Sequence, residues 1–455
     1  MLFFILFISG KSIFGCFILY IIPLTFITFA RSKNIGYLKQ KRRLMENFFD
    51  DKIAERLGGQ SFGKSNVIYK FELIKRAKAE AIKAHPGSDL IDMGVGEPDW
   101  PADEMVVRTL SEEAGKSENR WYADNGIPEF QKAAAQYLEK VYGLSGLNPF
   151  DNIIHGIGSK PILAMLPICF INPGDVLLTT VPGYPVTGTY TRYLGGEVFN
   201  LPLYESNSFL PDLSSVPGAV LKKAKLLYIN YPNNPTGAVA NVEFFEQVVD
   251  FARKNNIIVI NDAAYGALTY DGHKPVSFLS ADGAMDIGLE VHSLSKAFNM
   301  TGWRIGFICG NNKAVSAFGA VKDNSDSGQF RAIQKAGIQA LNHTEITERT
   351  TVKYSRRFDM LADALNEVGF NAKKPGGTFY CYVKAPSGTE NGRVFNTASE
   401  FSEFLIRESL ISTVPWDDAG KYIRFSVTFE ADSPQKEKEV INEMKKRMKL
   451  LKLKF

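Results

Sequence analysis

Cysteine is scarce in this sequence of 455 residues, and no CxxC pair or other metal-ligand spacing occurs in it. The four cysteines, Cys16, Cys169, Cys309 and Cys381, are widely scattered, and the five histidines form no cluster. Disulfide-rich scaffolds and structural zinc sites depend on closely spaced cysteines or histidines. We therefore expect a reducing compartment and no metal site.

A basic body is also missing, although the formal net charge is +4. Residues 1–44 contribute seven positive charges and no negative one, so the remaining residues carry a net charge of −3. A nucleic-acid-binding protein is expected to present a basic surface on its folded part. The charge distribution therefore argues against a nucleic-acid partner.

The first 44 residues differ in composition from the rest of the chain. Residues 13–30 form an uncharged run of 18 residues, and basic residues follow from Arg31 to Arg43. Such a run is just long enough to span a bilayer, with the basic residues on the cytoplasmic side. Alternatively, translation starts at Met45, where ordinary soluble sequence begins. We favour the start at Met45 and a cytoplasmic protein, and a single N-terminal membrane anchor is the alternative.

From Met45 onward, short apolar segments alternate with segments of helix length. The apolar segments do not alternate in polarity, as expected for strands that are covered on both faces. We expect strands at 175–181, 224–230, 257–261 and 305–309, and helices at 69–85, 128–142, 241–255 and 327–341. This order predicts an α/β protein with a large, mostly parallel sheet. After about residue 323, helical sequence and strands at 378–383 and 422–428 predict a smaller α+β region.

Polar residues follow several of these strands, and open α/β sheets bind ligands at the carboxyl ends of their strands. Asp262 follows one strand, where it could also simply cap a turn. The turn 231–237, with the sequence YPNNPTG, follows another strand, and turn 181–185 contains Tyr184. Arg424 lies inside an apolar strand, and a buried arginine needs an anionic partner.

Two further segments suggest an anion site. Gly156–Pro161 runs into an apolar helix, and Pro161 suits the first helical position, which leaves free backbone N–H groups to bind an anion. The segment 292–307, HSLSKAFNMTGWRIGF, contains Lys296 among serines and Arg304 eight residues later. On a straight helix these two side chains would be about 12 Å apart along the axis. Asn299–Gly302 contains poor helix formers, so we expect the backbone to turn back there and to bring Arg304 and Lys296 to one ligand.

The ordered motifs GVGEPD, WYADNG, GIGSKP, PGYP, NYPNNPTG, NDAAY, SLSKAFNMTGWRIG and IRFSV resemble those of class I/II aminotransferases of the fold-type I pyridoxal-phosphate enzymes. The resemblance extends over essentially all of residues 45–455. It implies a large domain at 96–323 and a small C-terminal domain at 324–455. Residues 45–95 would then be an N-terminal arm that joins the small domain, and 1–44 an extension.

The resemblance also implies roles for individual residues. Lys296 would bond covalently to the aldehyde of pyridoxal 5′-phosphate, and Asp262 would keep the pyridine nitrogen protonated. Tyr265 and Asn234 would bind the oxygen on the ring, and Tyr184 would stack on the ring face. The phosphate group would be held by Ser159, Lys160, Ser293, Ser295 and Arg304, together with Tyr122 from the neighbouring subunit of a homodimer. The substrate would contact Arg424 through its α-carboxylate, and in addition Tyr69, Gly96, Lys160, Tyr184 and Asn234.

Longer strings, among them ENRWYADNGIPEF and KDNSDSGQF, resemble the branch of LL-diaminopimelate aminotransferases. This resemblance implies amino transfer between LL-diaminopimelate or tetrahydrodipicolinate and 2-oxoglutarate or glutamate, in lysine biosynthesis. Polar residues that could line the far end of such a site are Tyr69, Glu97, Asp124, Lys322, Asp326 and Gln329. The alternatives are an aminotransferase for aspartate, alanine or aromatic amino acids, and a non-catalytic regulator on the same fold. A regulator of that kind needs a DNA-binding domain, and the segment before residue 70 is too short for one.

Overall fold

The computed structural model describes residues 48–49, 51–64 and 70–455. The chain divides into two compact units, Met1–Ile68 and Tyr69–Phe455. Within the described part of the first unit, two short 3₁₀ turns lie at Glu55–Leu57 and Gly59–Ser61. The candidate site and all other elements belong to the second unit. The uncharged run at residues 13–30 and Tyr69 lie outside the described residues.

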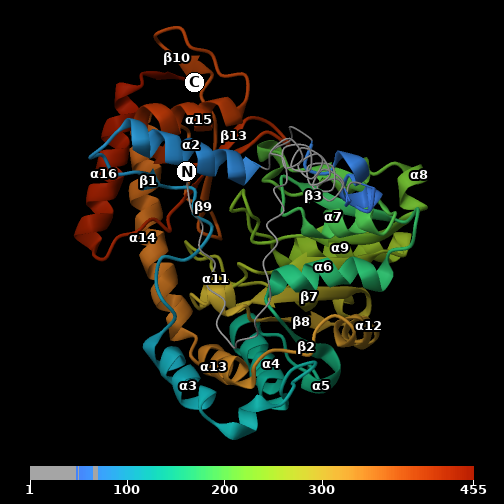
Figure 1. Cartoon of the computed structure of the whole chain (residues 1–455). Coiled ribbons are helices and arrows are strands. Elements are labelled where there is room, and N and C mark those ends of the chain that lie inside the picture. The colour runs from blue at the N-terminus through green and yellow to red at the C-terminus, as the bar shows by residue number, and fades with distance from the viewer. Residues whose placement is uncertain (1–47, 50, 65–69) are drawn as a thin grey trace, which may run out of the picture. The chain divides into compact units, whose positions relative to one another are not determined.

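A seven-stranded sheet forms the larger part of the second unit (Figure 1). Its strands are β2 (Ile153–Gly156), β3 (Val176–Val181), β4 (Glu197–Pro202), β5 (Ala224–Ile229), β6 (Ile258–Asp262), β7 (Gly288–Ser293) and β8 (Gly306–Gly310). Their order is β2-β8-β7-β6-β5-β3-β4, and β8 pairs antiparallel with both of its neighbours. The strands between β7 and β4 are parallel. The predicted large, mostly parallel sheet is therefore confirmed.

Helices cover both faces of this sheet. Successive residues of a strand point to opposite faces, so each strand contributes side chains to two cores. Leu178 and Leu227 face one core, and their neighbours Leu177 and Leu226 face the other. The first core is covered by α4 (Pro128–Tyr142), α9 (Val242–Asn255) and α13 (Arg331–Asn342). The second core is covered by α6 (Ser159–Phe170), α7 (Val186–Tyr193) and α12 (Asn312–Asp323). Burial on both faces explains why these strands are apolar throughout.

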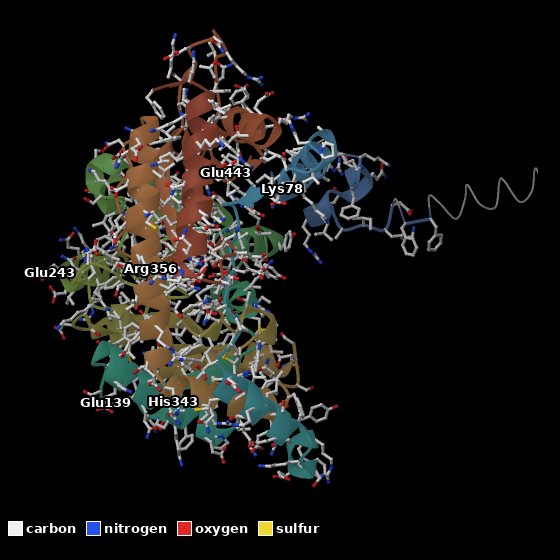
Figure 2. All side chains as sticks on the ribbon, turned by 90° about the vertical axis from the view of Figure 1, so that its left-hand side faces the viewer. Lys78, Glu139, Glu243, His343, Arg356 and Glu443 are labelled. Carbon is white, nitrogen blue, oxygen red and sulfur yellow. The ribbon has the colours of Figure 1, made fainter. Side chains whose placement is uncertain are left out.

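A separate, third core is built around a three-stranded antiparallel sheet, in the order β12 (Val414–Trp416), β13 (Tyr422–Ser426), β9 (Tyr380–Lys384). It packs against α14 (Glu345–Val368), α15 (Ala398–Ser409) and α16 (Pro434–Leu450). On α14, Arg356 bonds through its guanidinium to Glu437 at the start of α16, and the two helices lie side by side (Figure 2). There are also two short two-stranded sheets. In one, β1 (Ile91–Asp92) pairs with β11 (Ile411–Ser412), and in the other, β10 (Gly388–Thr389) pairs with β14 (Leu453–Lys454).

The remaining helices are α2 (Lys70–Ala84), α3 (Glu104–Ala114), α5 (Pro149–Asn152), α8 (Gly218–Leu221), α10 (Ala284–Ile287) and α11 (Leu294–Ala297). Along α2, Ala77 and Ala81 pack on Ile406 and Leu410. None of the helices in the described residues is long and apolar enough to cross a membrane.

The sequence located most of these elements correctly. The six strands predicted by residue range agree with the structure to within two residues at each end. The helix expected at 327–341 was placed too early, since α13 begins at Arg331. The preceding residues form a turn instead, in which Gly328 has φ +81° and its N–H donates to the carboxylate of Asp326.

Candidate active site

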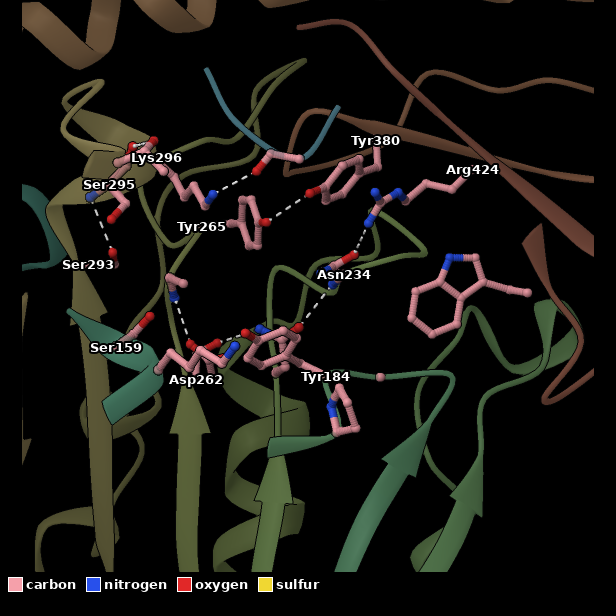
Figure 3. Close-up of a pocket in the computed structure, with 18 of the residues that line it drawn as sticks. Ser159, Tyr184, Asn234, Asp262, Tyr265, Ser293, Ser295, Lys296, Tyr380 and Arg424 are labelled. Carbon is pink, nitrogen blue, oxygen red and sulfur yellow. Dashed lines mark hydrogen bonds between the residues drawn. The ribbon is translucent and has the colours of Figure 1, made fainter. Parts of the chain in front are cut away.

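A cavity of about 520 Å³ lies at the carboxyl ends of the central parallel strands, between them and the three-stranded sheet (Figure 3). Most of the residues proposed from the sequence line this one cavity. They are Gly96, Ser159, Lys160, Tyr184, Asn234, Asp262, Tyr265, Ser293, Ser295, Lys296, Arg304 and Arg424. The structure therefore brings together side chains that are up to about three hundred positions apart in the sequence.

Lys296 extends into the cavity from the short helix α11, which directly follows β7. Its amine donates a hydrogen bond of 2.7 Å to the carbonyl oxygen of Gly96. Burial lowers the pKa of Lys296 to about 8; the carboxylate of Glu97 opposes this shift, while the guanidinium groups of Arg304 and Arg424 add to it. A lysine with such a pKa is a better nucleophile and base near neutral pH than an exposed lysine.

The backbone reverses after Lys296, as the sequence predicted. Asn299 has φ +56°, a 3₁₀ turn follows at Thr301–Trp303, and Arg304 itself has φ +57°. The guanidinium of Arg304 donates to the carbonyl of Thr301 at 2.7 Å and lines the same cavity as Lys296. The eight-residue spacing is thus compatible with both cations facing one ligand.

An anion cradle surrounds this arginine. The α6 helix begins at Ser159, directly after Gly158, so its first N–H groups are directed at the cavity end of the sheet. A Cβ on Gly158 would lie 2.5 Å from the Arg304 guanidinium, and its φ is +80°, so only glycine fits there. Pro161 was expected at the first helical position but is the third residue of α6, because Ser159 and Lys160 already belong to the helix.

Asp262 ends β6 and is almost completely buried. One carboxylate oxygen accepts a hydrogen bond from the Tyr228 hydroxyl at 3.0 Å, and the other accepts from the N–H of Ala264 at 3.1 Å. Burial raises the pKa of Asp262 to about 6, and these two hydrogen bonds and the charge of Lys296 oppose that shift. Asp262 therefore does cap a turn, and its ionised form would gain from a cationic partner inside the cavity.

Arg424 lies on β13, the central strand of the small sheet, and is 4% exposed. Its guanidinium donates to the side-chain oxygen of Asn234 at 2.9 Å and to the carbonyl of Gly94 at 3.3 Å, and it lies 3.9 Å above the ring of Tyr380. Its Nε has no hydrogen-bond partner, and no carboxylate pairs with it among the described residues. A buried guanidinium in that state is suited to bind a carboxylate ligand.

Tyr265 and Tyr380 complete this side of the cavity. Their hydroxyl groups are 3.1 Å apart, and burial raises the pKa of Tyr265 well above its ordinary value. Tyr265 therefore stays protonated near neutral pH and can donate a hydrogen bond to an oxygen in the cavity.

The segment that carries Gly96 is held in place by a buried group of charges, the Asp99 cluster, formed by Asp99, Lys353, Tyr354, Arg357 and Glu437. One oxygen of Asp99 accepts from the Lys353 amine at 2.8 Å and the Tyr354 hydroxyl at 3.1 Å, and the other lies 3.0 Å from Arg357. Arg357 also bonds to Glu437 at 2.9 Å. The cluster therefore attaches the loop after Gly96 to helices α14 and α16.

Some predicted residues lie elsewhere. Tyr122 is 78% exposed and does not line the cavity of its own chain. Asp124, Lys322, Asp326 and Gln329 do not line it either, so they are not wall residues of this cavity.

Lys322 is only 1% exposed, and its amine donates to the Asp124 carbonyl and to the Asp326 carboxylate. Gln329 donates to the carbonyl of Arg304 at 2.7 Å, so it supports the cradle from behind.

The structure also adds residues that the sequence did not single out. Tyr380, Trp416 and Asp418 line the cavity, and Tyr228 lies behind it against Asp262. Tyr228 is hidden in an apolar strand, and no local pattern marks it as polar in function. Tyr380 could have been found from the register of the small sheet, because it lies on β9 next to the strand of Arg424.

Comparison with known proteins agrees with this geometry. Residues 88–441 match the sequence profile of the family described as aminotransferase class I and II. An LL-diaminopimelate aminotransferase of Methanocaldococcus jannaschii is 58% identical over 419 residues, which are 90% of this chain and 100% of that protein. An enzyme of the same name from Moorella thermoacetica is 40% identical over 357 residues, which are 78% of this chain and 89% of that protein.

Solved structures show the same fold. Substrate-bound BacF from Bacillus subtilis superposes with a TM-score of 0.79 at 33% identity, over 89% of this chain and 98% of that chain. A double mutant of Thermus thermophilus aspartate aminotransferase superposes with a TM-score of 0.75 at 26% identity, over 87% of this chain and 99% of that chain.

Proposed function

The chain belongs to the class I and II aminotransferases, and from that premise we propose that it transfers an amino group between LL-diaminopimelate and 2-oxoglutarate, with pyridoxal 5′-phosphate as cofactor. The observation that supports the amino acid most directly is the 58% identity to an archaeal LL-diaminopimelate aminotransferase over that protein's whole length. In the biosynthetic direction glutamate is the amino donor and tetrahydrodipicolinate the acceptor.

The residues of the cavity fit this cofactor group by group. Pyridoxal phosphate carries an aldehyde, a ring nitrogen and a phosphate, and the cavity offers a partner of suitable chemistry for each. Lys296 supplies the amine, and the buried carboxylate of Asp262 supplies the negative charge. The phosphate group would be held by Ser159, Lys160, Ser293, Ser295, Arg304 and the N-terminus of α6, all of which border the cavity.

In the reaction, the bound cofactor supplies an aldehyde that takes up the amino group and a protonated ring that accepts an electron pair. Asp262 keeps the ring nitrogen protonated, since the ion pair favours the charged forms of both partners. Tyr265 and Asn234, which line the cavity, would donate hydrogen bonds to the oxygen on the ring, and Tyr184 would cover one ring face.

Lys296 would move the proton. Its lowered pKa leaves part of its amine neutral near neutral pH, so the amine can accept a proton from the substrate Cα and deliver it to C4′ of the cofactor. The Gly96 carbonyl, which accepts a hydrogen bond from this amine, holds the lysine inside the cavity whenever it is not covalently engaged. The segment attached by the Asp99 cluster therefore positions the base.

Arg424 binds the α-carboxylate of the substrate through a bidentate pair, assisted by the backbone N–H of Gly96. Asn234 already orients the guanidinium from one side, and the ring of Tyr380 supports it from below. A clamp fixed in this way places the substrate amino group toward Lys296. Tyr69 is proposed to cover the substrate, although it lies outside the described residues.

We further propose a homodimer in which Tyr122 of the partner subunit reaches the phosphate group. The exposure of Tyr122, at 78%, and its absence from the cavity wall of its own chain support this arrangement.

The domain boundaries predicted from the sequence, 96–323 and 324–455, remain part of the proposal. The seven strands of the large sheet lie within the first range, and the three of the small sheet within the second. A cytoplasmic location is likewise a proposal.

A substrate panel tests the proposed reaction. Purified protein loaded with pyridoxal phosphate is incubated with 2-oxoglutarate and one amino acid at a time, and glutamate formation is measured. LL-diaminopimelate is expected to give the highest kcat/KM, well above aspartate, alanine and phenylalanine.

The structural likeness to aspartate aminotransferase makes aspartate the second candidate. Turnover of aspartate without turnover of LL-diaminopimelate would reverse the order of the two proposals.

A further inference from the structure

Besides Arg424, the small sheet contributes Trp416 to the wall of the cavity. Arg424 pairs with Tyr382 on β9, and Tyr422 pairs with Trp416 on β12. Because alternate residues of a strand share a face, these four side chains lie on the same side of the sheet. The rings of Tyr382 and Tyr422 stack at 4.5 Å with an interplanar angle of 7°. Both rings pack in one cluster with Trp416 and Phe209, and of these aromatic side chains only Trp416 lines the cavity.

Asp418 lies two residues beyond Trp416 in the chain. The β12 strand ends at Trp416, and Asp418 forms an isolated bridge with Gly420 in the turn toward β13. Both Trp416 and Asp418 line the cavity. The neighbouring carboxylate of Asp417 is already engaged, since it accepts from the N–H of Ala398 at 2.6 Å and caps α15. The Asp418 carboxylate is exposed and has no hydrogen-bond or ion-pair partner among the residues that the structure describes.

The charges of the cavity single out Asp418. The cationic residues that line the cavity are Lys160, Lys296, Arg304 and Arg424. Under the proposed function all four bind the cofactor or the α-carboxylate. Of the two carboxylates among the described lining residues, Asp262 is buried and serves the ring nitrogen. Asp418 is the other one, and neither the cofactor nor the α-amino acid group uses it.

The position of Asp418 suits the far end of an extended substrate. Trp416 on β12 pairs with Tyr422 on β13, two residues from Arg424, and Asp418 lies two residues beyond Trp416. Measured along the strand direction, Asp418 is therefore about four residues, or about 13 Å, from Arg424. Arg424, Trp416 and Asp418 all line the one cavity. A substrate whose α-carboxylate binds Arg424 and whose chain extends past Trp416 therefore directs its distal end toward Asp418.

We propose that Asp418 determines specificity by binding the distal ammonium group of a diamino acid. This inference rests on the proposed function and adds the residue that distinguishes the second amino acid end from a plain carboxylate. A distal ammonium is attracted by Asp418, whereas a distal carboxylate without an ammonium beside it is repelled. The remote binding interaction thus favours diaminopimelate over mono-amino diacids of the same length.

The experiment compares wild type and Asp418→Asn with two substrates that differ by one group. LL-diaminopimelate has the distal ammonium, and L-2-aminopimelate has the same carbon chain and both carboxylates but lacks it. The variant is expected to lower kcat/KM for LL-diaminopimelate about tenfold, because a charge-assisted hydrogen bond is lost. It is expected to raise kcat/KM for L-2-aminopimelate, because a repulsion is removed.

Three controls separate specificity from stability. Asp282→Asn removes another exposed carboxylate that does not line the cavity, and it should leave the ratio of the two kcat/KM values unchanged. Asp418→Glu should restore part of the preference for LL-diaminopimelate, and the cofactor absorbance verifies that every variant is folded and loaded.

The two possible failures are distinguishable. If wild type does not turn over LL-diaminopimelate, the proposed function fails and this inference fails with it. If wild type does so, and Asp418→Asn changes both substrates in parallel or neither, only the role of Asp418 is overturned. A fall for LL-diaminopimelate combined with a rise for L-2-aminopimelate supports the role.

Discussion

The amine of Lys296 lies 2.7 Å from the carbonyl oxygen of Gly96, although 200 positions separate them in the sequence. Gly96 belongs to a segment attached to β13, because the N–H of Ser426 donates to Met93 and the Arg424 guanidinium donates to Gly94. The same segment thus contacts Lys296 on one side and β13, the strand of Arg424, on the other. A displacement of this segment would therefore change the surroundings of both side chains.

The pH dependence of Lys296 follows from its lowered pKa of about 8 in the cofactor-free protein. Only the neutral amine attacks an aldehyde, so the rate of covalent loading with pyridoxal phosphate should rise with pH and level off above about pH 8. An ordinary lysine would show no plateau until about pH 10.4. The measurement is the rate of absorbance change after mixing apo-protein with the cofactor at each pH.

Glu97→Gln tests whether the neighbouring charges set the pKa of Lys296, because the direction of the expected change is known. The Glu97 carboxylate raises the pKa of Lys296, so removing its charge should move the midpoint of the loading profile to lower pH. A midpoint that stays fixed or moves upward would contradict this electrostatic account.

Replacing Asp262 with Asn tests the ring-nitrogen partner. The amide keeps the shape of the side chain but removes its charge, and an ion pair at about 4 Å with an effective dielectric of 20 is worth about 4 kcal/mol. We expect kcat to fall about a thousandfold, measured in single turnovers with saturating cofactor. Tyr228→Phe removes only the hydrogen bond to Asp262 and should cost far less. Equal losses in the two variants would argue against the charge as the cause.

Arg424→Lys should weaken substrate binding more than chemistry. Lysine retains the charge but loses the planar fork, and hydrogen bonds to charged groups contribute enough that KM should rise about tenfold to a hundredfold. Steady-state kinetics with LL-diaminopimelate and with glutamate measure this change, and both substrates should be affected because both have an α-carboxylate. Arg393→Lys, at an exposed position outside the cavity, is the matched control. An unchanged KM in Arg424→Lys would exclude the clamp.

Shared active sites predict complementation between two inactive variants. Lys296→Ala lacks the amine, and Tyr122→Ala lacks the side chain proposed to act in the other subunit. In a mixed dimer one site carries both changes and the other carries neither, so an equimolar mixture should recover about a quarter of wild-type activity. The mixture is refolded or co-expressed before the assay. Recovery of no activity, with mixed dimers demonstrated by differential tags, would rule out the contribution of Tyr122.

Asp99→Asn should destabilise the fold. The side chains of Asp99 and Lys353 are 2% and 3% exposed, and loss of one partner from a buried ion pair typically costs about 3–5 kcal/mol. Urea unfolding measures the difference in the free energy of unfolding. Glu367→Gln removes the exposed acceptor of Lys445 and Lys449 and should change that free energy little. Similar effects of the two substitutions would show that burial of the Asp99 cluster does not matter.

The sequence was informative where local pattern and burial agree. Apolar, non-alternating segments identified the strands, and Pro128 and Gly143 marked the two ends of α4. The poor helix formers and the glycine of Asn299–Gly302 correctly indicated the reversal that brings Arg304 back to Lys296, and in the structure Asn299 has φ +56°. Most of the proposed cavity residues were assigned through the resemblance of their motifs to those of class I/II aminotransferases.

The remainder depended on contacts between distant segments. Nothing local distinguishes Tyr228, on an apolar strand, from a core tyrosine, since its role depends on Asp262 of the adjacent strand. Lys322 was named only as a polar residue that could line the far end of the site, and tertiary packing buries it against Asp124 and Asp326. Adjacent carboxylates Asp417 and Asp418 look equivalent in the sequence, and only the packing of α15 separates them.

The position of Arg424 in the middle strand of the small sheet has a consequence for biosynthesis. β13 needs β9 and β12 as neighbours, and Arg357 further fixes its end through the carbonyls of Val427 and Phe429. During translation these three strands leave the ribosome after all seven strands of the large sheet. In a growing chain the residues of the anion cradle are therefore synthesised before the arginine proposed to bind the substrate carboxylate.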